Sequence, residues 1–326
     1  MKPIILGIGA AFFFGVTFIL NRSMDLSGGS WHWSAALRFF YMVPLLWLIV
    51  WMRGNVWPVF QELRERFGIW FLWSTVGFVL FYAPITYAAG FGAAWLVAAT
   101  WQITIVAGSL LVPFFYETNG GERGERQKIP FKGLGFSVLI LAGVALVQVQ
   151  EADAINGSVW LHVVLPVLIA AIAYPLGNRK MMVVTNKRLD AFQRAFGMTI
   201  ASLPWWVVLA VVGFVEGGPP TNNQLWQTFL VAISSGVIAT VLFFQATDLC
   251  ANDPVKLAGV EATQSAEIIF VLAGEMWLLS IASPTLLSLF GVLIIMLGMF
   301  LHSFYGKREV VPKKSMKLAK IMNKNM

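Results

Sequence analysis

Residues 254–279, PVKLAGVEATQSAEIIFVLAGEMWLL, decide the fold of this chain. Apolar residues dominate the stretch, and about 20 residues at about 1.5 Å each are enough to cross a bilayer. Yet it contains three carboxylates, Glu261, Glu267 and Glu275. An ionisable group at bilayer depth costs about 3 kcal/mol or more, so it marks a pathway, a proton site or a buried pair. The rest of the chain is then the scaffold that makes these charges tolerable.

The composition indicates a polytopic membrane protein. Of the 326 residues, 58% are hydrophobic and only 12% are charged, whereas soluble proteins are about 25% charged. The net charge of +7 does not indicate nucleic-acid binding, because the basic residues cluster at the ends of apolar stretches and in one tail. Cys250 is the only cysteine, which excludes an internal disulfide and a cysteine-based metal cluster.

The hydropathy pattern predicts an all-α integral membrane protein with ten spans and no soluble domain. Residues 117–130 form the longest polar loop and are expected to be a flexible cytoplasmic linker, and residues 306–326 a basic cytoplasmic tail. The predicted spans are 3–21, 33–52, 68–88, 92–115, 131–149, 158–177, 191–214, 225–247, 255–279 and 284–305.

The distribution of basic residues predicts the orientation in the membrane. When both termini are placed in the cytoplasm, 20 of the 23 Lys and Arg residues fall on the inner side. Arg22 alone falls on the outer side, and Arg38 and Arg194 fall inside spans. Because cytoplasmic loops carry an excess of Lys and Arg, this bias supports both the span count and the orientation.

The two halves of the chain share short motifs in the same order, which indicates an internal repeat of residues 1–116 and 131–150 by residues 158–305. Five spans per half is an odd number, so the second half must be inserted upside down relative to the first. Inverted repeats are typical of transporters, whose site lies at the repeat interface near the bilayer midplane. The matched positions are Asn21 with Asn178, Arg38 with Arg194, Tyr82 with Phe244, and Gln102 with Gln264.

With five plus five spans, short loops and a basic tail, residues 1–305 resemble the drug/metabolite transporter superfamily, and within it the bacterial branch of multidrug-resistance efflux transporters. The resemblance implies a central cavity, lined by the first four spans of each half, through which a small molecule moves with or without proton coupling. The related small exporters use a Glu in their first span. Here neither 3–21 nor 158–177 contains a carboxylate, so the proton site is assigned on physical grounds to 255–279.

Glu267 is the candidate for the transport and proton site, because it lies at the middle of its span with no Lys or Arg at its own depth. Burial disfavours the charged form of such a carboxyl group and favours proton exchange. Glu261 is the second candidate. The alternative for Glu267 is a structural role, in which it only hydrogen-bonds neighbouring helices.

Two buried charge pairs are expected from depth alone. Arg194 and Glu261 both lie toward the cytoplasmic side, and Arg38 and Glu275 both lie in the outer third. Pairing offsets the cost of burial, and the loss of one partner would strand the other charge. The alternative is that the two arginines bind an anionic substrate.

Five further side chains are expected to line the cavity: Gln102, Gln264, Trp101, Tyr82 and Phe244. Amides inside membranes commonly bond across helices, and aromatic rings suit lipophilic cations through cation–π contact. Packing against helices or lipid is the alternative for each. No cofactor or metal is expected, since the sequence contains no H-E-x-x-H, G-x-S-x-G or phosphate-loop motif.

We therefore predict a secondary active transporter, not an enzyme, that crosses the cell membrane many times and keeps both termini in the cytoplasm. Its partners would be a small-molecule substrate, protons and the lipid bilayer, with no nucleic acid, and a monomer is compatible with the sequence. The favoured cargo is a small lipophilic or cationic compound exported in exchange for protons. The alternatives are export of a polar metabolite such as an amino acid, nucleoside or sugar derivative, and, more remotely, a membrane-embedded enzyme or receptor.

Overall fold

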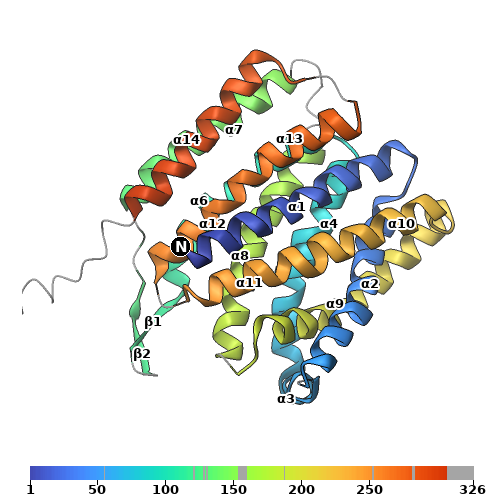
Figure 1. The fold of residues 1–326 in the computed structure, drawn as a ribbon, viewed down its shortest axis with the longest axis vertical. Helices are drawn as coiled ribbons and strands as arrows, with labels where there is room; N and C mark the ends of the chain where they lie inside the picture. Colours follow the sequence, from blue (N-terminus) through green and yellow to red (C-terminus); the bar gives the residue numbers. More distant parts are fainter. Residues whose placement is uncertain are drawn as a thin grey trace, which may run out of the picture.

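The computed structural model of the protein is a bundle of helices (Figure 1). It describes residues 1–54, 56–119, 122–127, 129, 131–152, 160–186, 188–251, 253–280 and 283–306. Each of the ten predicted spans coincides with one helix or with several helices in a row. Within the described residues, 6 helical stretches are long and apolar enough to cross a membrane, and further helices are apolar but shorter. The fold is therefore consistent with an integral membrane protein.

The first half of the chain contains nine helical elements and two strands in the described residues. They are α1 (Lys2–Leu26), α2 (Trp31–Met52), α3 (Val56–Ser74), the π-helix η1 (Thr75–Val79), α4 (Leu80–Ala89), α5 (Ala94–Trp101), α6 (Ile103–Leu110), the 3-10 turn η2 (Val112–Phe114), β1 (Tyr116–Asn119), β2 (Glu122–Arg126) and α7 (Phe131–Ala152).

The second half continues with helices that are interrupted in the same way. They are the π-helix η3 (Trp160–Val164), α8 (Leu165–Thr185), α9 (Ala191–Gly217), α10 (Asn222–Val231), the π-helix η4 (Ala232–Ala239), α11 (Thr240–Asp248), α12 (Pro254–Ala262), the 3-10 turn η5 (Thr263–Ser265), α13 (Ala266–Leu278) and α14 (Leu286–Gly306).

The polar stretch within the first half, expected at residues 117–130 to be a flexible linker, contains two strands. Strands β1 and β2 pair antiparallel, and the Arg126 Nε donates a hydrogen bond to the Tyr116 hydroxyl at 3.2 Å. The Asn-Gly-Gly sequence at 119–121 is typical of a hairpin turn and was the available signal. The predicted basic tail from residue 307 onward lies outside the described residues.

The helices pack in pairs that join the two halves. Helix α7 lies alongside α14 at one edge of the bundle (Figure 1), and α2 packs against α9. Helix α1 packs against η4 and α11, while α8 packs against η1 and α4. Helix α5 contacts α13, and α6 contacts α12. The remaining helices therefore surround a centre to which both halves contribute.

Close helix contact is achieved where glycines face each other. A Cβ atom on Gly177 of α8 would collide with the backbone of Gly77 in η1. Small residues at such crossings let membrane helices approach until their backbones touch. The helical stretches that cross the bundle are also interrupted, by π-helices at Thr75–Val79 and Ala232–Ala239 and by a break at Gln102. Such irregular turns are frequent at functional sites.

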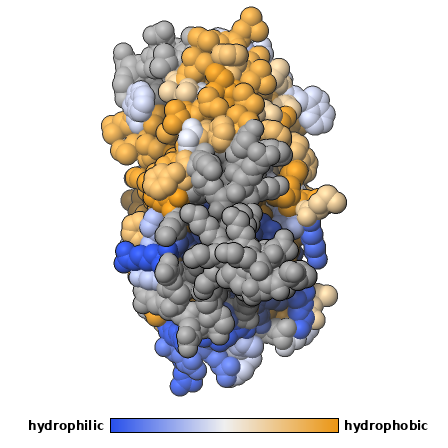
Figure 2. All heavy atoms as spheres, turned by 90° about the vertical axis from the view of Figure 1, so that its left-hand side faces the viewer, coloured by the Kyte–Doolittle hydropathy of each residue, from blue (hydrophilic) through white to orange (hydrophobic). Residues whose placement is uncertain are grey.

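The surface of the bundle is apolar over much of its height. Figure 2 shows hydrophobic residues gathered over the upper part of one face and hydrophilic residues at its lower end. Large side chains such as Trp277, Leu286 and Phe300 are at least half exposed. An exposed apolar surface of this extent indicates contact with lipid. Buried polar groups are found instead between the helices.

Candidate functional site

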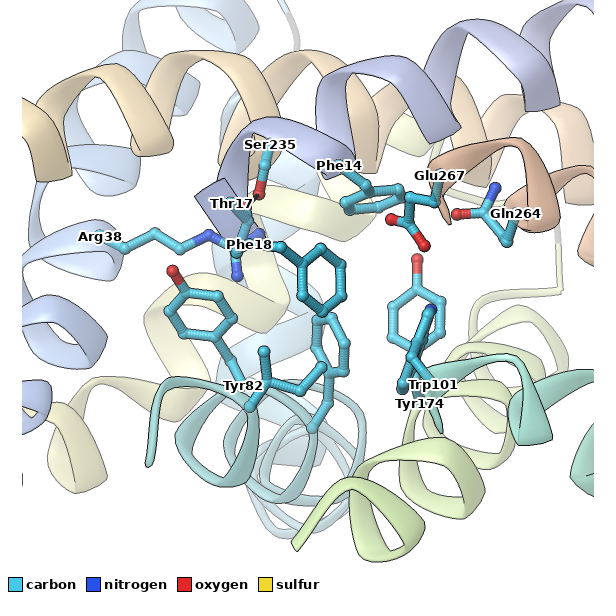
Figure 3. A pocket seen from close by; sticks show the side chains of 12 residues that line it. Phe14, Thr17, Phe18, Arg38, Tyr82, Trp101, Tyr174, Ser235, Gln264 and Glu267 are labelled. Atoms are coloured by element: carbon cyan, nitrogen blue, oxygen red, sulfur yellow. Dashed lines mark hydrogen bonds between the residues drawn. The ribbon is translucent and has the colours of Figure 1, made fainter. Parts of the chain in front are cut away.

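A nearly closed cavity lies at the centre of the bundle, where both halves meet (Figure 3). Its free space holds about one water molecule. Side chains from α1, α2, α4, α5, α8, η4, η5 and α13 form its wall. They are Phe14, Thr17, Phe18, Arg38, Phe81, Tyr82, Ile85, Trp101, Tyr174, Ser235, Gln264 and Glu267.

Glu267 is part of this wall and belongs to α13, which lies in the predicted span 255–279. Only 1% of its surface is exposed. The Trp101 side chain is a hydrogen-bond partner of the carboxyl group, but its Oε2 atom has no partner. The Tyr174 hydroxyl is also buried without a partner and points toward the Glu267 carboxyl group (Figure 3). An unsatisfied carboxyl oxygen in so apolar a place is costly, which favours a functional reason for it.

Arg38 occupies the opposite side of the cavity from Glu267 (Figure 3). Its side chain is 2% exposed, and its guanidinium carbon lies 3.9 Å from the centre of the Tyr82 ring. Neither Nε nor Nη1 has a hydrogen-bond partner. No described carboxylate forms an ion pair with this guanidinium, whereas other arginines of the chain do form ion pairs. The Tyr82 side chain is also a hydrogen-bond partner of this guanidinium. Among the described residues, the cavity therefore contains a buried cation whose partner is a neutral tyrosine and not a carboxylate.

The expected pair of Arg38 with Glu275 is wrong. Both Glu275 oxygens instead accept backbone hydrogen bonds, at 2.8 Å from the Ala94 nitrogen and at 2.8 Å from the Trp95 nitrogen. These two N–H groups begin α5, and the first N–H groups of a helix have no partner within it. A carboxylate there also meets the positive end of the helix dipole. The prediction compared only depths in the membrane, and depth does not show that the N–H groups at the start of α5 compete with Arg38 for Glu275.

The expected pair of Arg194 with Glu261 is also wrong. Arg194 Nη1 lies 2.6 Å from the Asp248 carboxylate, at the end of α11. Glu261 is bound by Arg179, whose Nε and Nη2 donate to it at 3.0 Å and 2.6 Å. The physical reason is helix length, since α8 continues to Thr185 and carries Arg179 inside the bundle. Glu261 is therefore occupied by an ion pair.

The other predicted wall residues divide into two groups. Gln264, Trp101 and Tyr82 line the cavity, whereas Gln102 and Phe244 are buried outside its wall. The Gln102 amide nitrogen donates to the Ala98 and Gln264 carbonyl oxygens at 3.0 and 3.4 Å. The Phe244 ring lies 4.5 Å from the guanidinium carbon of Arg194. Their roles in the described conformation are therefore local.

Thr17, Ser235 and Tyr174 line the cavity but were not predicted from the sequence. Thr17 of α1 donates a hydrogen bond to Ser235 of η4, and this contact joins the two halves. Small hydroxyl residues are common in apolar helices, so nothing in the sequence singles them out. Phe14, Phe81 and Phe243 surround the Tyr174 ring. The one available signal for Tyr174 was its position beside Pro175 in an apolar span.

The fold and the cavity define the class: a multi-pass helical membrane protein with polar groups enclosed between its two halves. The chain belongs to the family described as "Putative multidrug resistance efflux transporter" (EmrE), whose model matches residues 1–308. The family is one of transporters, which points away from an enzyme.

Two relatives and one solved structure are similar to this chain. It is 57% identical over 318 residues to the uncharacterized protein YjlA of Bacillus subtilis (strain 168), covering 97% of this chain and 98% of that protein. It is 49% identical over 267 residues to an uncharacterized 42.1 kDa protein of Shouchella clausii, covering 82% and 70%. A crystal structure described only as that of a protein has a TM-score of 0.63 at 13% identity, over 94% and 98% of the two chains. This last likeness shows a shared fold.

Proposed function

We propose that this protein is a secondary transporter that exports a small molecule in exchange for protons, with Glu267 as the proton site. One observation carries the proposal: a fully buried carboxyl group with an unpartnered oxygen lies in a cavity to which both halves of the chain contribute. Membership of an efflux-transporter family supports the direction of transport. The cell membrane with both termini in the cytoplasm is the proposed location, on the Lys and Arg distribution.

The proposal includes ten spans arranged as two inverted repeats of five helices. The packing of the helices supports it, because a contact between a helix of the first half and a helix of the second half has a counterpart in which the two halves have changed places. Helix α1 packs against α11, and the corresponding α8 packs against α4. Helices α2 and α9 correspond and contact each other, as do α7 and α14. Two inverted halves around one central site permit alternating access by rocking of one half against the other.

The chemistry of Glu267 suits coupling. A carboxyl group in this cavity is neutral when protonated and leaves a buried negative charge when the proton departs, which a substrate can offset. The proton and the substrate then compete for the Glu267 carboxyl group. Release of the proton on one side of the membrane permits the substrate to bind, and release of the substrate permits a proton to bind. Glu261 is the weaker candidate, because Arg179 already neutralises it at 2.6 Å.

The cargo is proposed from the wall of the cavity. Phe14, Phe18, Phe81, Trp101 and Tyr174 present aromatic rings, which bind lipophilic and cationic compounds. This wall favours a small lipophilic or cationic cargo. The unpaired guanidinium of Arg38 favours the second candidate, export of a metabolite with polar or anionic groups.

Transport by reconstituted protein tests this function. Proteoliposomes loaded at one pH and diluted into another would be given a lipophilic cation such as tetraphenylphosphonium and a panel of metabolites. We expect a pH gradient to drive accumulation by the natural protein, and Glu267→Gln to abolish it while leaving folding intact. Glu65→Gln, on the exposed side of α3, is the matched control. If Glu267→Gln accumulates cargo normally under the gradient, Glu267 is not the proton site.

A further inference from the structure

We propose that the cargo is a small zwitterion whose carboxylate binds Arg38 and whose ammonium group binds Glu267, with an apolar spacer between them. The inference rests on the proposed function in taking the central cavity as the transport site. It narrows the cargo to one chemical class, which the aromatic wall alone does not do.

The first step is a comparison of two corresponding arginines. Arg194 lies over the Phe244 ring and also binds Asp248 at 2.6 Å. Arg38 lies over the Tyr82 ring in the same manner. Asp248 follows Phe244 by four residues, and the residue that follows Tyr82 by four is Thr86. The first half therefore has the arginine and its aromatic partner without the carboxylate.

The missing carboxylate leaves a charge that no carboxylate in the described part of the chain neutralises. An arginine stays protonated even when buried, so Arg38 cannot shed its charge as a lysine could. Its Nε and Nη1 are both unpartnered at 2% exposure. A buried charge without an ionic partner destabilises the folded protein. A ligand carboxylate would offset that cost with charge-assisted hydrogen bonds, in the place that Asp248 takes beside Arg194.

The second step concerns the opposite wall. Glu267 has an unpartnered Oε2 and, beside it, the unpartnered hydroxyl of Tyr174. An ionised carboxylate with a spare oxygen accepts hydrogen bonds from an ammonium group, and the Tyr174 ring adds a cation-binding face. Figure 3 shows Arg38 and Glu267 on opposite sides, with aromatic rings between them. A ligand that meets both groups therefore carries its two charges at the ends of an apolar body. Because the cavity as described holds about one water molecule, the aromatic side chains between the two groups must move apart to admit such a ligand.

This arrangement discriminates against simpler cargo. A pure cation that reached Glu267 would share the cavity with the uncompensated Arg38 charge, and like charges repel strongly where water is excluded. A pure anion would satisfy Arg38 and leave the Glu267 end without a partner. A zwitterion satisfies both groups and enters with no net charge.

Equilibrium binding to the full-length protein in detergent, without a pH gradient, tests the inference. The probes are 4-(aminomethyl)benzoate, which carries both charges across one ring, 4-methylbenzylamine, which keeps only the cation, and 4-methylbenzoate, which keeps only the anion. We expect the zwitterion to bind about tenfold or more tightly than either relative, as one charge-assisted contact each would give. Equal or tighter binding of the amine, or no binding of any probe, would overturn the inference.

Three variants separate binding from folding. We expect Arg38→Gln to lose about tenfold or more in affinity for the zwitterion while its melting temperature without ligand stays equal or rises, because no native partner is stranded. Arg194→Gln is the matched control and should do the reverse, lowering the melting temperature and keeping the affinity. Arg38→Lys keeps the charge and should retain part of the affinity. If Arg38→Gln melts earlier by as much as Arg194→Gln, or binds normally, Arg38 is structural and the inference fails.

The outcome is independent of proton coupling. Zwitterion-selective binding that Arg38→Gln abolishes, together with transport that ignores the pH gradient, would refute the proposed coupling and keep the binding site. Gradient-driven transport of a pure cation with unselective binding would keep the coupling and refute the zwitterion.

Discussion

Arg179 holds both oxygens of Glu261, through Nε at 3.0 Å and Nη2 at 2.6 Å, and its Nη1 donates to the Gly108 carbonyl oxygen at 2.7 Å. This one side chain therefore connects α8, α12 and α6. Both partners are buried, at 5% exposure each. A pair of this kind fixes the positions of three helices, and its charges are unavailable for transport.

The first prediction concerns the stability of this pair. Arg179→Met or Glu261→Met alone should lower the unfolding free energy by about 3–5 kcal/mol, because the other member of the pair would remain buried without its partner. Replacing both residues, as Arg179→Met with Glu261→Met, should recover most of that loss. Denaturant unfolding in detergent measures the four members of the cycle. A coupling energy near zero would mean that the two side chains do not interact.

The second prediction concerns the cap that Glu275 makes on α5. In Glu275→Gln the neutral side chain keeps one acceptor oxygen and places an NH2 group against the second backbone N–H. We expect a loss of about 1–3 kcal/mol in unfolding free energy, the range for a hydrogen bond to a charged group. Glu65→Gln on the exposed surface should change it little. Retention of full stability by Glu275→Gln would contradict the two 2.8 Å contacts.

The third prediction concerns the crossing of α8 and η1. Gly177→Ala should cost about 1–3 kcal/mol or more, because the new methyl group meets the backbone of Gly77 and forces the helices apart. Gly68→Ala in α3 is the matched control, since a Cβ there meets nothing within 4 Å, and the helix gains about 1 kcal/mol in propensity. Thermal unfolding of the two variants should move in opposite directions. Equal shifts would show that the crossing is not tightly packed.

The fourth prediction concerns orientation. A Cys250→Ser background removes the native thiol, and single cysteines then replace Asn119 or Asn156. An impermeant thiol reagent on intact cells should label position 156 and leave 119 unlabelled until the cells are permeabilised. Asn119 ends β1, while Asn156 lies outside the described residues. The opposite pattern of labelling would refute the proposal that both termini are cytoplasmic.

The sequence by itself determined where the helices are. Each predicted span coincides with helical structure, from Lys2–Leu26 to Leu286–Gly306, because the length and hydropathy of a span are properties of consecutive residues. It also identified Glu267 as a fully buried carboxyl group, since a charge in the middle of an apolar stretch is visible without any partner. The hairpin at Tyr116–Arg126 was missed because the charges of that stretch outweighed its turn signal.

Only the tertiary structure decided which charges meet. Arg38, Arg194, Glu261 and Glu275 are all buried as expected, but none pairs as their depths suggested. Depth orders residues along one axis, whereas a contact depends on which helices are neighbours, which faces they present and where they end. Arg179 reaches Glu261 because α8 continues beyond its apolar residues. Glu275 binds the buried N–H groups that begin α5, which have no partner within their own helix. Among the described residues, Arg38 has no carboxylate partner in this arrangement, and the sequence cannot show this because it does not show which helices are neighbours.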